Sequence, residues 1–192
     1  MNTRLRSLVV AALSLYLWGA VAAGAAGEVT LGGSFHLIDQ DGKPRTDADF
    51  RGAYPLIYFG FTRCPDLCPR SLGTMTAALD ELEQRAPDKA GRVTPIFITV
   101  DPERDDAATI KSYIAAFHPR LVGLTGAAEE IDRVTRDYGA FYAPVPQQGG
   151  DYAMDHSGFI LLMGPAGEYL THFESSVGAE ELARELEQRV AP

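Results

Sequence analysis

The chain has 192 residues, of which 46% are hydrophobic and 22% charged, a composition typical of a globular protein rather than a disordered or collagen-like one. The formal net charge of −9 argues against a nucleic-acid-binding protein, because such proteins are usually basic. Two cysteines are too few for a disulfide-rich scaffold, and the length allows one domain that needs neither a disulfide nor a structural metal in order to fold.

The first 27 residues have the pattern of an export signal. Arg4 and Arg6 precede an uncharged stretch, residues 7–27, that is strongly apolar at first and then rich in Ala and Gly. The small residues favour a cleaved signal peptide, but about 20 apolar residues also suffice for a retained membrane anchor. Both interpretations predict an exported domain, residues 28–192, in the bacterial periplasm. Without residues 1–27 the net charge becomes −11, because only two positive charges are removed.

The first half of this domain alternates strands and helices. FHLI precedes DQDGKP, a strong turn signal. Residues 54–61 and 93–100 are nearly continuous apolar runs and predict two strands buried on both faces of a sheet. Between them, apolar residues recur every three or four positions, which predicts a helix. A second helix, carrying Ile110 and Ile114, is expected to start at Asp101-Pro102.

The second half predicts a short extended piece at 121–124 and a helix at about 128–138. The Pro- and Gly-rich residues 143–155 are expected to form a long loop. Strands at 158–163 and 168–173 form a hairpin, and a helix at 179–190 closes the chain. This order predicts an α/β, thioredoxin-like fold: a mixed central sheet flanked by helices, with an insertion and an N-terminal extended or hairpin extension.

The two cysteines lie between a predicted buried strand and a predicted helix. Cys64 and Cys68 form a C-x-x-x-C motif where open α/β sheets usually carry their chemistry. A helix N-terminus favours thiolates, and this spacing brings both sulfurs to one side of a helical turn. The pair suits a two-thiolate metal site or a reversible disulfide. A merely stabilising disulfide would close a very short loop and contribute little.

A metal site needs further ligands, and the sequence offers four histidines. His36, His118 and His172 are expected to be surface or capping residues. His156 ends the predicted loop, which comes close to the cysteine loop in a thioredoxin-like fold, so it could add an imidazole. Two thiolates and one imidazole favour Cu(I), with Cu(II) as a second state, because structural zinc normally takes four protein ligands.

The sequence resembles the Sco/SenC family, the copper-binding proteins that assist assembly of cytochrome c oxidase. The matching stretches cover essentially the whole exported domain and are YFGFTRCPDLCP, FITVDPERD, FHPRLVGLTG and DYAMDHSGFILLM. The resemblance implies a thioredoxin-like fold, and a copper site made of Cys64, Cys68 and His156.

Two carboxylates are weaker candidates for the same site. The resemblance associates Asp101 with the copper site or its redox behaviour, while Asp before Pro102 also suits a helix N-cap. Asp155 is a candidate for orienting the His156 ring from outside the ligand set. Its other interpretation is an ordinary solvated loop residue.

Three functions compete. The first is a copper metallochaperone for the dinuclear copper site of cytochrome c oxidase subunit II or another periplasmic copper protein. Whether copper would pass through another carrier stays open. The second is a thiol–disulfide oxidoreductase that uses Cys64 and Cys68 to reduce the cysteines of the target. The third, a thiol peroxidase, fits poorly with the C-x-x-x-C spacing and the histidine.

Overall fold

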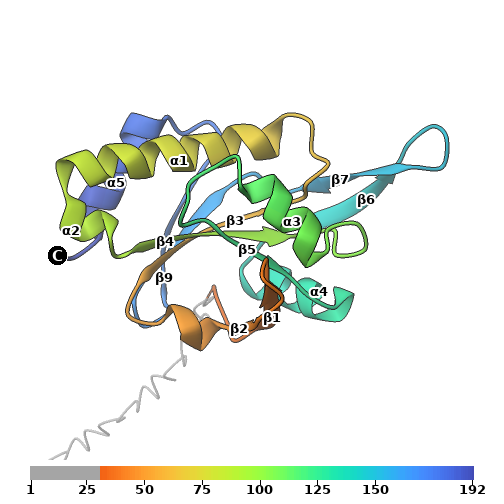
Figure 1. Cartoon of the computed structure of the whole chain (residues 1–192), viewed down its shortest axis with the longest axis horizontal. Helices are drawn as coiled ribbons and strands as arrows, with labels where there is room; N and C mark the ends of the chain where they lie inside the picture. Colours follow the sequence, from red (N-terminus) through yellow and green to blue (C-terminus); the bar gives the residue numbers. More distant parts are fainter. Residues whose placement is uncertain (1–30) are drawn as a thin grey trace, which may run out of the picture.

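The computed structural model describes residues 31–192, so the predicted export segment and its boundary at residue 27 lie outside the described residues. The described part is a mixed α/β fold around a seven-stranded sheet of order β2-β1-β5-β4-β3-β8-β9 (Figure 1). The thioredoxin-like prediction is confirmed. Within residues 31–192 no helix is both long and apolar enough to cross a bilayer.

The predicted N-terminal extension is a hairpin of β1 (His36–Asp39) and β2 (Pro44–Thr46). Its turn is held by the Asp39 side chain, whose Oδ1 accepts the N–H groups of Asp41 and Lys43. Gly42 has a φ of 76°, a left-handed conformation that glycine adopts without strain. A short 3-10 helix, η1 (Asp47–Phe50), leads into the centre of the sheet.

The two apolar runs form the central strands. β3 (Tyr54–Gly60) and β4 (Val93–Thr99) pair in parallel, and β5 (Val122–Thr125) continues the parallel set. Every residue of β3 is buried, as its continuous apolar pattern predicts. β8 (Ile160–Met163) runs antiparallel to β3, and β9 (Tyr169–Phe173) antiparallel to β8.

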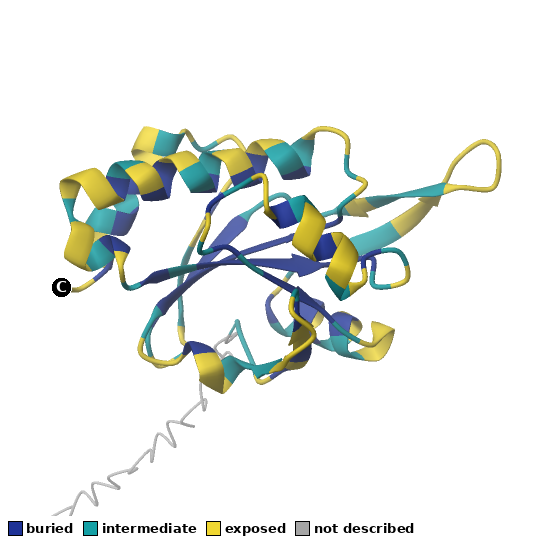
Figure 2. Cartoon of the chain, viewed as in Figure 1, coloured by how far each residue is buried: buried dark blue, intermediate teal, exposed yellow. Residues whose placement is uncertain are grey.

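Helices cover both faces of the sheet. The long helix α1 (Leu67–Arg85) packs against α5 (Ala179–Arg189), and the short α2 (Pro87–Ala90) follows α1 (Figure 1). α3 (Ala107–Ile114) lies on the same face as α1, because its residue Tyr113 contacts the ring of Phe97, and that ring lies beside Gly60 together with the Sγ of Cys68 from α1. α4 (Ala128–Asp137) covers the other face, where Tyr138 contacts Phe59. Figure 2 shows buried residues along the central strands and exposed ones on the outer sides of the helices.

The prediction of a long loop at 143–155 was wrong. This segment forms a separate two-stranded antiparallel sheet of β6 (Tyr142–Pro146) and β7 (Tyr152–His156), which projects from the body of the fold (Figure 1). Pro144 and Pro146 lie on β6, and a two-stranded ribbon tolerates proline because one edge of each strand has no partner. The Pro- and Gly-rich composition concealed the strands.

The predicted start of the second helix was also wrong. Asp101 and Pro102 begin a turn, and α3 starts only at Ala107. Asp106 is its N-cap, and its side chain accepts the N–H of Thr109 at 2.7 Å. The residues between β4 and α3 are therefore free to make other contacts, and they surround the candidate site.

Candidate metal centre

The two cysteines lie where the sequence predicts, beyond the carboxyl end of β3. Cys64 is half-buried in the loop before α1, and Cys68 is buried in the first turn of α1. Both are free thiols. The backbone N–H of Cys68 donates to the Sγ of Cys64 at 3.3 Å, so Cys64 takes an N–H group that the helix itself cannot satisfy.

The environment separates the protonation states of the two thiols. A hydrogen bond from the Cys68 thiol is the main cause that lowers the pKa of Cys64 to about 3, with further contributions from His156 and backbone N–H groups. The hydrogen bond to Cys64, together with burial, raises the pKa of Cys68. The metal-free pair is therefore one thiolate that accepts a hydrogen bond from one thiol.

His156 ends β7 and points its ring at the pair. Its Nε2 lies 3.4 Å from the Sγ of Cys68, and its Nδ1 lies 2.9 Å from the carbonyl oxygen of Ser157. A carbonyl can only accept, so Nδ1 carries a proton, and Nε2 is the ring nitrogen that faces the sulfurs. The edges of Phe61 and Tyr58 contact the ring, with centroid separations of 5.7 and 6.1 Å.

These three side chains form a set that could hold a metal ion. The sulfurs of Cys64 and Cys68 and a ring nitrogen of His156 all lie within 4.8 Å of one another, and no other such group of His, Cys, Asp or Glu occurs within residues 31–192. Two sulfurs and one imidazole nitrogen are soft donors, which fit Cu(I). The hydroxyl of Tyr58 is buried on the same side and has no hydrogen-bond partner among the described residues.

The weaker carboxylate candidates have other partners. Asp101 is buried and does not cap a helix, contrary to the predicted alternative; it forms an ion pair with Arg104 and accepts the hydroxyl of Tyr152 at 2.9 Å. Asp155 is exposed, and because neighbours on a strand point to opposite faces, it does not share the face of His156. The Ser157 carbonyl orients the ring instead.

The remaining histidines lie outside the set. His36 and His172 are exposed, as expected for surface residues. His118 is only 4% exposed and lies beyond Ala115, the C-cap of α3, so the expectation of a surface or capping residue was wrong for it; its Nδ1 accepts the backbone N–H of Arg120 at 3.1 Å in the turn that follows. Burial lowers the pKa of His118, which keeps this acceptor unprotonated.

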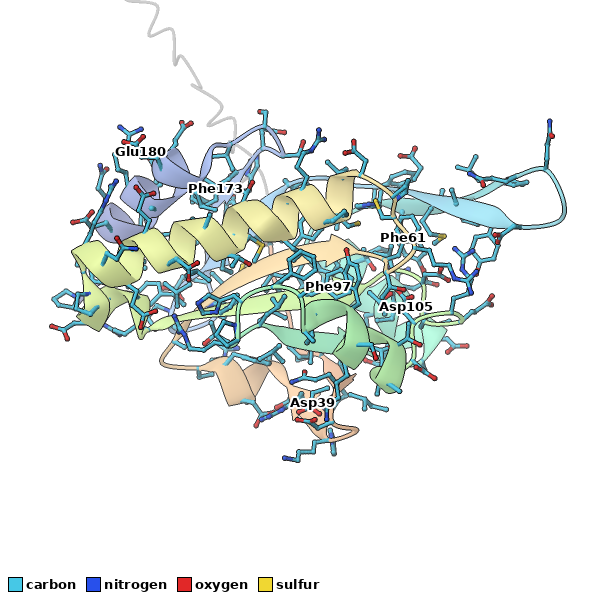
Figure 3. The ribbon with its side chains drawn as sticks, turned by 45° about the horizontal axis from the view of Figure 1, so that its top comes forward. Asp39, Phe61, Phe97, Asp105, Phe173 and Glu180 are labelled. Atoms are coloured by element: carbon cyan, nitrogen blue, oxygen red, sulfur yellow. The ribbon has the colours of Figure 1, made fainter. Side chains whose placement is uncertain are left out.

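The sequence reasoning missed Asp105, which is fully buried behind the cysteine loop. Its Oδ2 accepts the N–H of Thr62 at 2.9 Å and the hydroxyl of Thr99 at 2.7 Å, and its Oδ1 accepts the hydroxyl of Thr62 at 2.5 Å. Figure 3 shows Asp105 and Phe61 at the same end of the sheet. Asp105 fell in the first turn of the helix expected to start at Asp101-Pro102, where an acidic residue gives no signal for burial, and that helix boundary was wrong.

A family model described as SCO1/SenC matches residues 23–191. The human protein "Protein SCO1 homolog, mitochondrial" is 42% identical over 169 residues, which are 86% of this chain and 55% of that protein. The mouse protein "Protein SCO2 homolog, mitochondrial" is 43% identical over 160 residues, 83% of this chain and 62% of that protein. The chain thus spans somewhat more than half the length of these relatives.

Solved structures agree with the sequence relatives. Bradyrhizobium japonicum ScoI with copper bound has a TM-score of 0.76 and 41% identity, over 83% of this chain and 99% of that one. Yeast Sco1 with copper bound has a TM-score of 0.76 and 34% identity, over 83% and 88% of the two chains. The family match spans nearly all the described residues and includes the two cysteines and the histidine, so the chain belongs to the SCO1/SenC family.

Proposed function

We propose that the protein is an exported copper metallochaperone that carries copper on Cys64, Cys68 and His156. In this proposal it assists assembly of the dinuclear copper site of cytochrome c oxidase subunit II, or of another periplasmic copper protein. The observation that carries it is the convergence of two sulfurs and an imidazole nitrogen within 4.8 Å. The two copper-bound Sco structures at 41% and 34% identity support the choice of metal.

The donor set favours Cu(I) as the cargo, and an imidazole also leaves Cu(II) as a second state. One sulfur is held as a thiolate before any metal arrives, because a hydrogen bond from Cys68 lowers the pKa of Cys64. Only Cys68 then has to lose a proton when the metal binds. Cys64 is half-buried, so copper held there would be accessible from solvent to a partner.

The proposed location is the bacterial periplasm, reached through residues 1–27 as a signal peptide or a retained anchor. Their basic start and uncharged apolar stretch support export. An oxidising compartment makes the redox state of the two cysteines part of the function, because only the reduced pair can hold copper.

The test of copper binding is a titration of the reduced protein with Cu(I) against a competing chelator under anaerobic conditions. We expect one equivalent to be retained. Cys64→Ser, Cys68→Ser and His156→Ala should each weaken binding by more than the roughly 10- to 100-fold typical for loss of a partner outside the ligand set. His36→Ala is the matched control, since His36 is exposed on β1. Binding by His156→Ala as tight as the parent's would contradict the three-ligand site.

A second function, thiol–disulfide reduction of the target, is favoured by the unequal thiols. The Cys64 thiolate can attack a target disulfide and form a mixed disulfide with release of one target thiolate. Cys68 then loses its proton and displaces the second target sulfur, which leaves a Cys64–Cys68 disulfide. The target gains two electrons and the pair loses two.

One variant separates the two functions. His156→Ala keeps both thiols, so it should still reduce a disulfide-bonded copper domain of subunit II but should fail to deliver copper to the reduced domain. Reduction is measured by thiol labelling of the target, and delivery by its copper content. Full delivery by His156→Ala would contradict the chaperone proposal, and no reduction by the parent would contradict the reductase.

A further inference from the structure

Six residues between β4 and α3, Asp101 to Asp106, contact both segments that carry the candidate ligands. We call these residues the 101–106 turn. Two neighbouring side chains of this turn contact different segments. Asp105 binds the cysteine loop, and Arg104 binds the β6–β7 hairpin, on which His156 lies. The distance between the two cysteines and His156 therefore depends on this turn, because the turn binds the segments that carry them.

The contact with the cysteine loop is made by Asp105. It accepts both the N–H and the hydroxyl of Thr62, two residues before Cys64. A fully buried carboxylate that satisfies three donors is costly to disturb, because a buried donor left without a partner is strongly destabilising. The cysteine loop is thus held firmly to the 101–106 turn.

The contact with the hairpin is made by Arg104, whose side chain is only 11% exposed. Its Nε donates to Asp101 at 2.5 Å, and its Nη1 donates to the side chain of Asp151 at 2.9 Å and to the carbonyl of Tyr152 at 2.8 Å. The guanidinium carbon lies 3.6 Å from the centroid of the Tyr152 ring. The Tyr152 hydroxyl closes the network by donating to Asp101 at 2.9 Å.

The hairpin needs such a contact because it is not part of the main sheet. An isolated two-stranded sheet is marginally stable at best in water. One end of β7 docks through His156 against Phe61 and Tyr58, and the other end docks through Tyr152 on Arg104. Tyr152 and His156 are four residues apart on one strand and point to the same face. Fixing Tyr152 therefore fixes the face on which the His156 ring lies.

We propose that Arg104 is a positioning residue for the metal centre: by holding Asp151 and Tyr152 to the 101–106 turn, it keeps the His156 ring against the two cysteines. The effect on copper binding rests on the proposed copper function, whereas the effect on the position of the His156 ring can be measured in the metal-free protein. A planar guanidinium can stack on the ring and donate to several acceptors together, whereas a lysine ammonium cannot.

The experiment compares the reduced parent with Arg104→Gln, Arg104→Lys and the matched control Arg133→Gln. Arg133 also forms an ion pair, with Glu130, and donates to the Ser34 carbonyl, but it contacts neither the hairpin nor the cysteine loop. The first readout is the set of nuclear Overhauser contacts between the rings of His156 and Phe61 in the metal-free protein. The second is Cu(I) affinity by chelator competition.

We expect Arg104→Gln to lose the ring contacts and to bind Cu(I) about 10-fold more weakly, the size of effect typical for a partner outside the ligand set. Arg104→Lys should restore neither the ring contacts nor the Cu(I) affinity, and Arg133→Gln should match the parent in both properties. Should Arg104→Gln fail to fold, Tyr152→Leu removes the stacked ring without leaving a buried aspartate unpaired, and the same losses are expected.

Unchanged ring contacts in Arg104→Gln, or in Tyr152→Leu where that variant is the one that folds, would overturn the inference. Equal loss of contacts in Arg133→Gln would overturn it as well, since the effect would then be general destabilisation. A parent that retains no copper would instead refute the proposed function, while the ring contacts of the metal-free variants would still decide the role of Arg104.

Discussion

Cys64 and Cys68 are chemically identical residues that the fold makes unequal. Cys64 is half-buried and accepts hydrogen bonds from the Cys68 thiol and from a backbone N–H at the start of α1, so its charged form is favoured. Cys68 is completely buried, and its pKa is raised. This one arrangement suits both proposed functions. In disulfide reduction Cys64 would be the nucleophile and Cys68 the resolving thiol, and in copper binding Cys64 would be a ligand that is already deprotonated.

We therefore predict that iodoacetamide modifies the reduced, metal-free protein at Cys64 alone. The pKa of about 3 lies far below neutrality, so the rate should be nearly constant between about pH 5 and 8, whereas an ordinary thiol gains about tenfold per pH unit there. Peptide mass spectrometry of samples quenched at each pH measures the rate and the position. In Cys64→Ser, Cys68 should react slowly and only at alkaline pH; a rate at Cys64 that rises through pH 8 would contradict the assignment.

At the scale of elements, the end of β3 and the start of α1 approach so closely that only glycine fits between them. A Cβ added at Gly60 would lie 2.8 Å from the Sγ of Cys68, 3.0 Å from the Tyr58 ring and 3.1 Å from the Phe97 ring. These neighbours are fully buried and have no free space into which to move. The position of the Cys68 sulfur is thus set by the strand as well as by the helix.

Gly60→Ala should therefore destabilise the fold by about 1–3 kcal/mol and also weaken Cu(I) binding, because the displaced atom is a candidate ligand. Gly73→Ala is the control on α1: an added Cβ there meets nothing within 4 Å, and replacing an exposed helical glycine should stabilise by about 0.5–1 kcal/mol. Urea unfolding and chelator competition measure the two effects. Parent-like stability and affinity in Gly60→Ala would show that the contact is looser than described.

The elements differ in how far their sequence determines them. β3 and β4 were predicted because nearly continuous apolar runs of this length occur in strands whose two faces are both covered, and that pattern is local. The β6–β7 hairpin was missed because β6 carries two prolines and its strands pair only with each other. What holds it is the stack of Arg104 on Tyr152 and the contact of His156 with Phe61, and both join residues far apart in the chain.

The same limit applies to the site. The C-x-x-x-C spacing and the strand-to-helix junction locate Cys64 and Cys68, and the family motif adds His156. Nothing local indicates that Asp105 holds the cysteine loop across 43 positions of sequence. Tertiary hydrogen bonds of buried polar groups have no periodicity, so they become visible only when the fold brings the groups together.

At the scale of the whole molecule, the candidate metal centre and the main helical packing lie at opposite ends of β3. The cysteines follow the carboxyl end of this strand, whereas the hydroxyl of Tyr54, its first residue, accepts the N–H of Ala191 just after α5. Leu186 is fully buried on α5, which packs against α1. Stability and metal binding should therefore be separable by mutation.

Leu186→Ala should lower the free energy of unfolding by about 2–5 kcal/mol through the cavity it leaves, and should keep the parent's Cu(I) affinity in the folded state. At free Cu(I) 100 times the dissociation constant, copper should add at most about 2.7 kcal/mol to the parent, and the same increment to Leu186→Ala, because any binding to the unfolded cysteines reduces both increments equally. His156→Ala should show the reverse, with a metal-free stability close to the parent's and a smaller increment. Urea unfolding of each protein with and without buffered Cu(I) measures these stabilities and increments, and a smaller increment in Leu186→Ala would mean that the two ends of β3 are coupled.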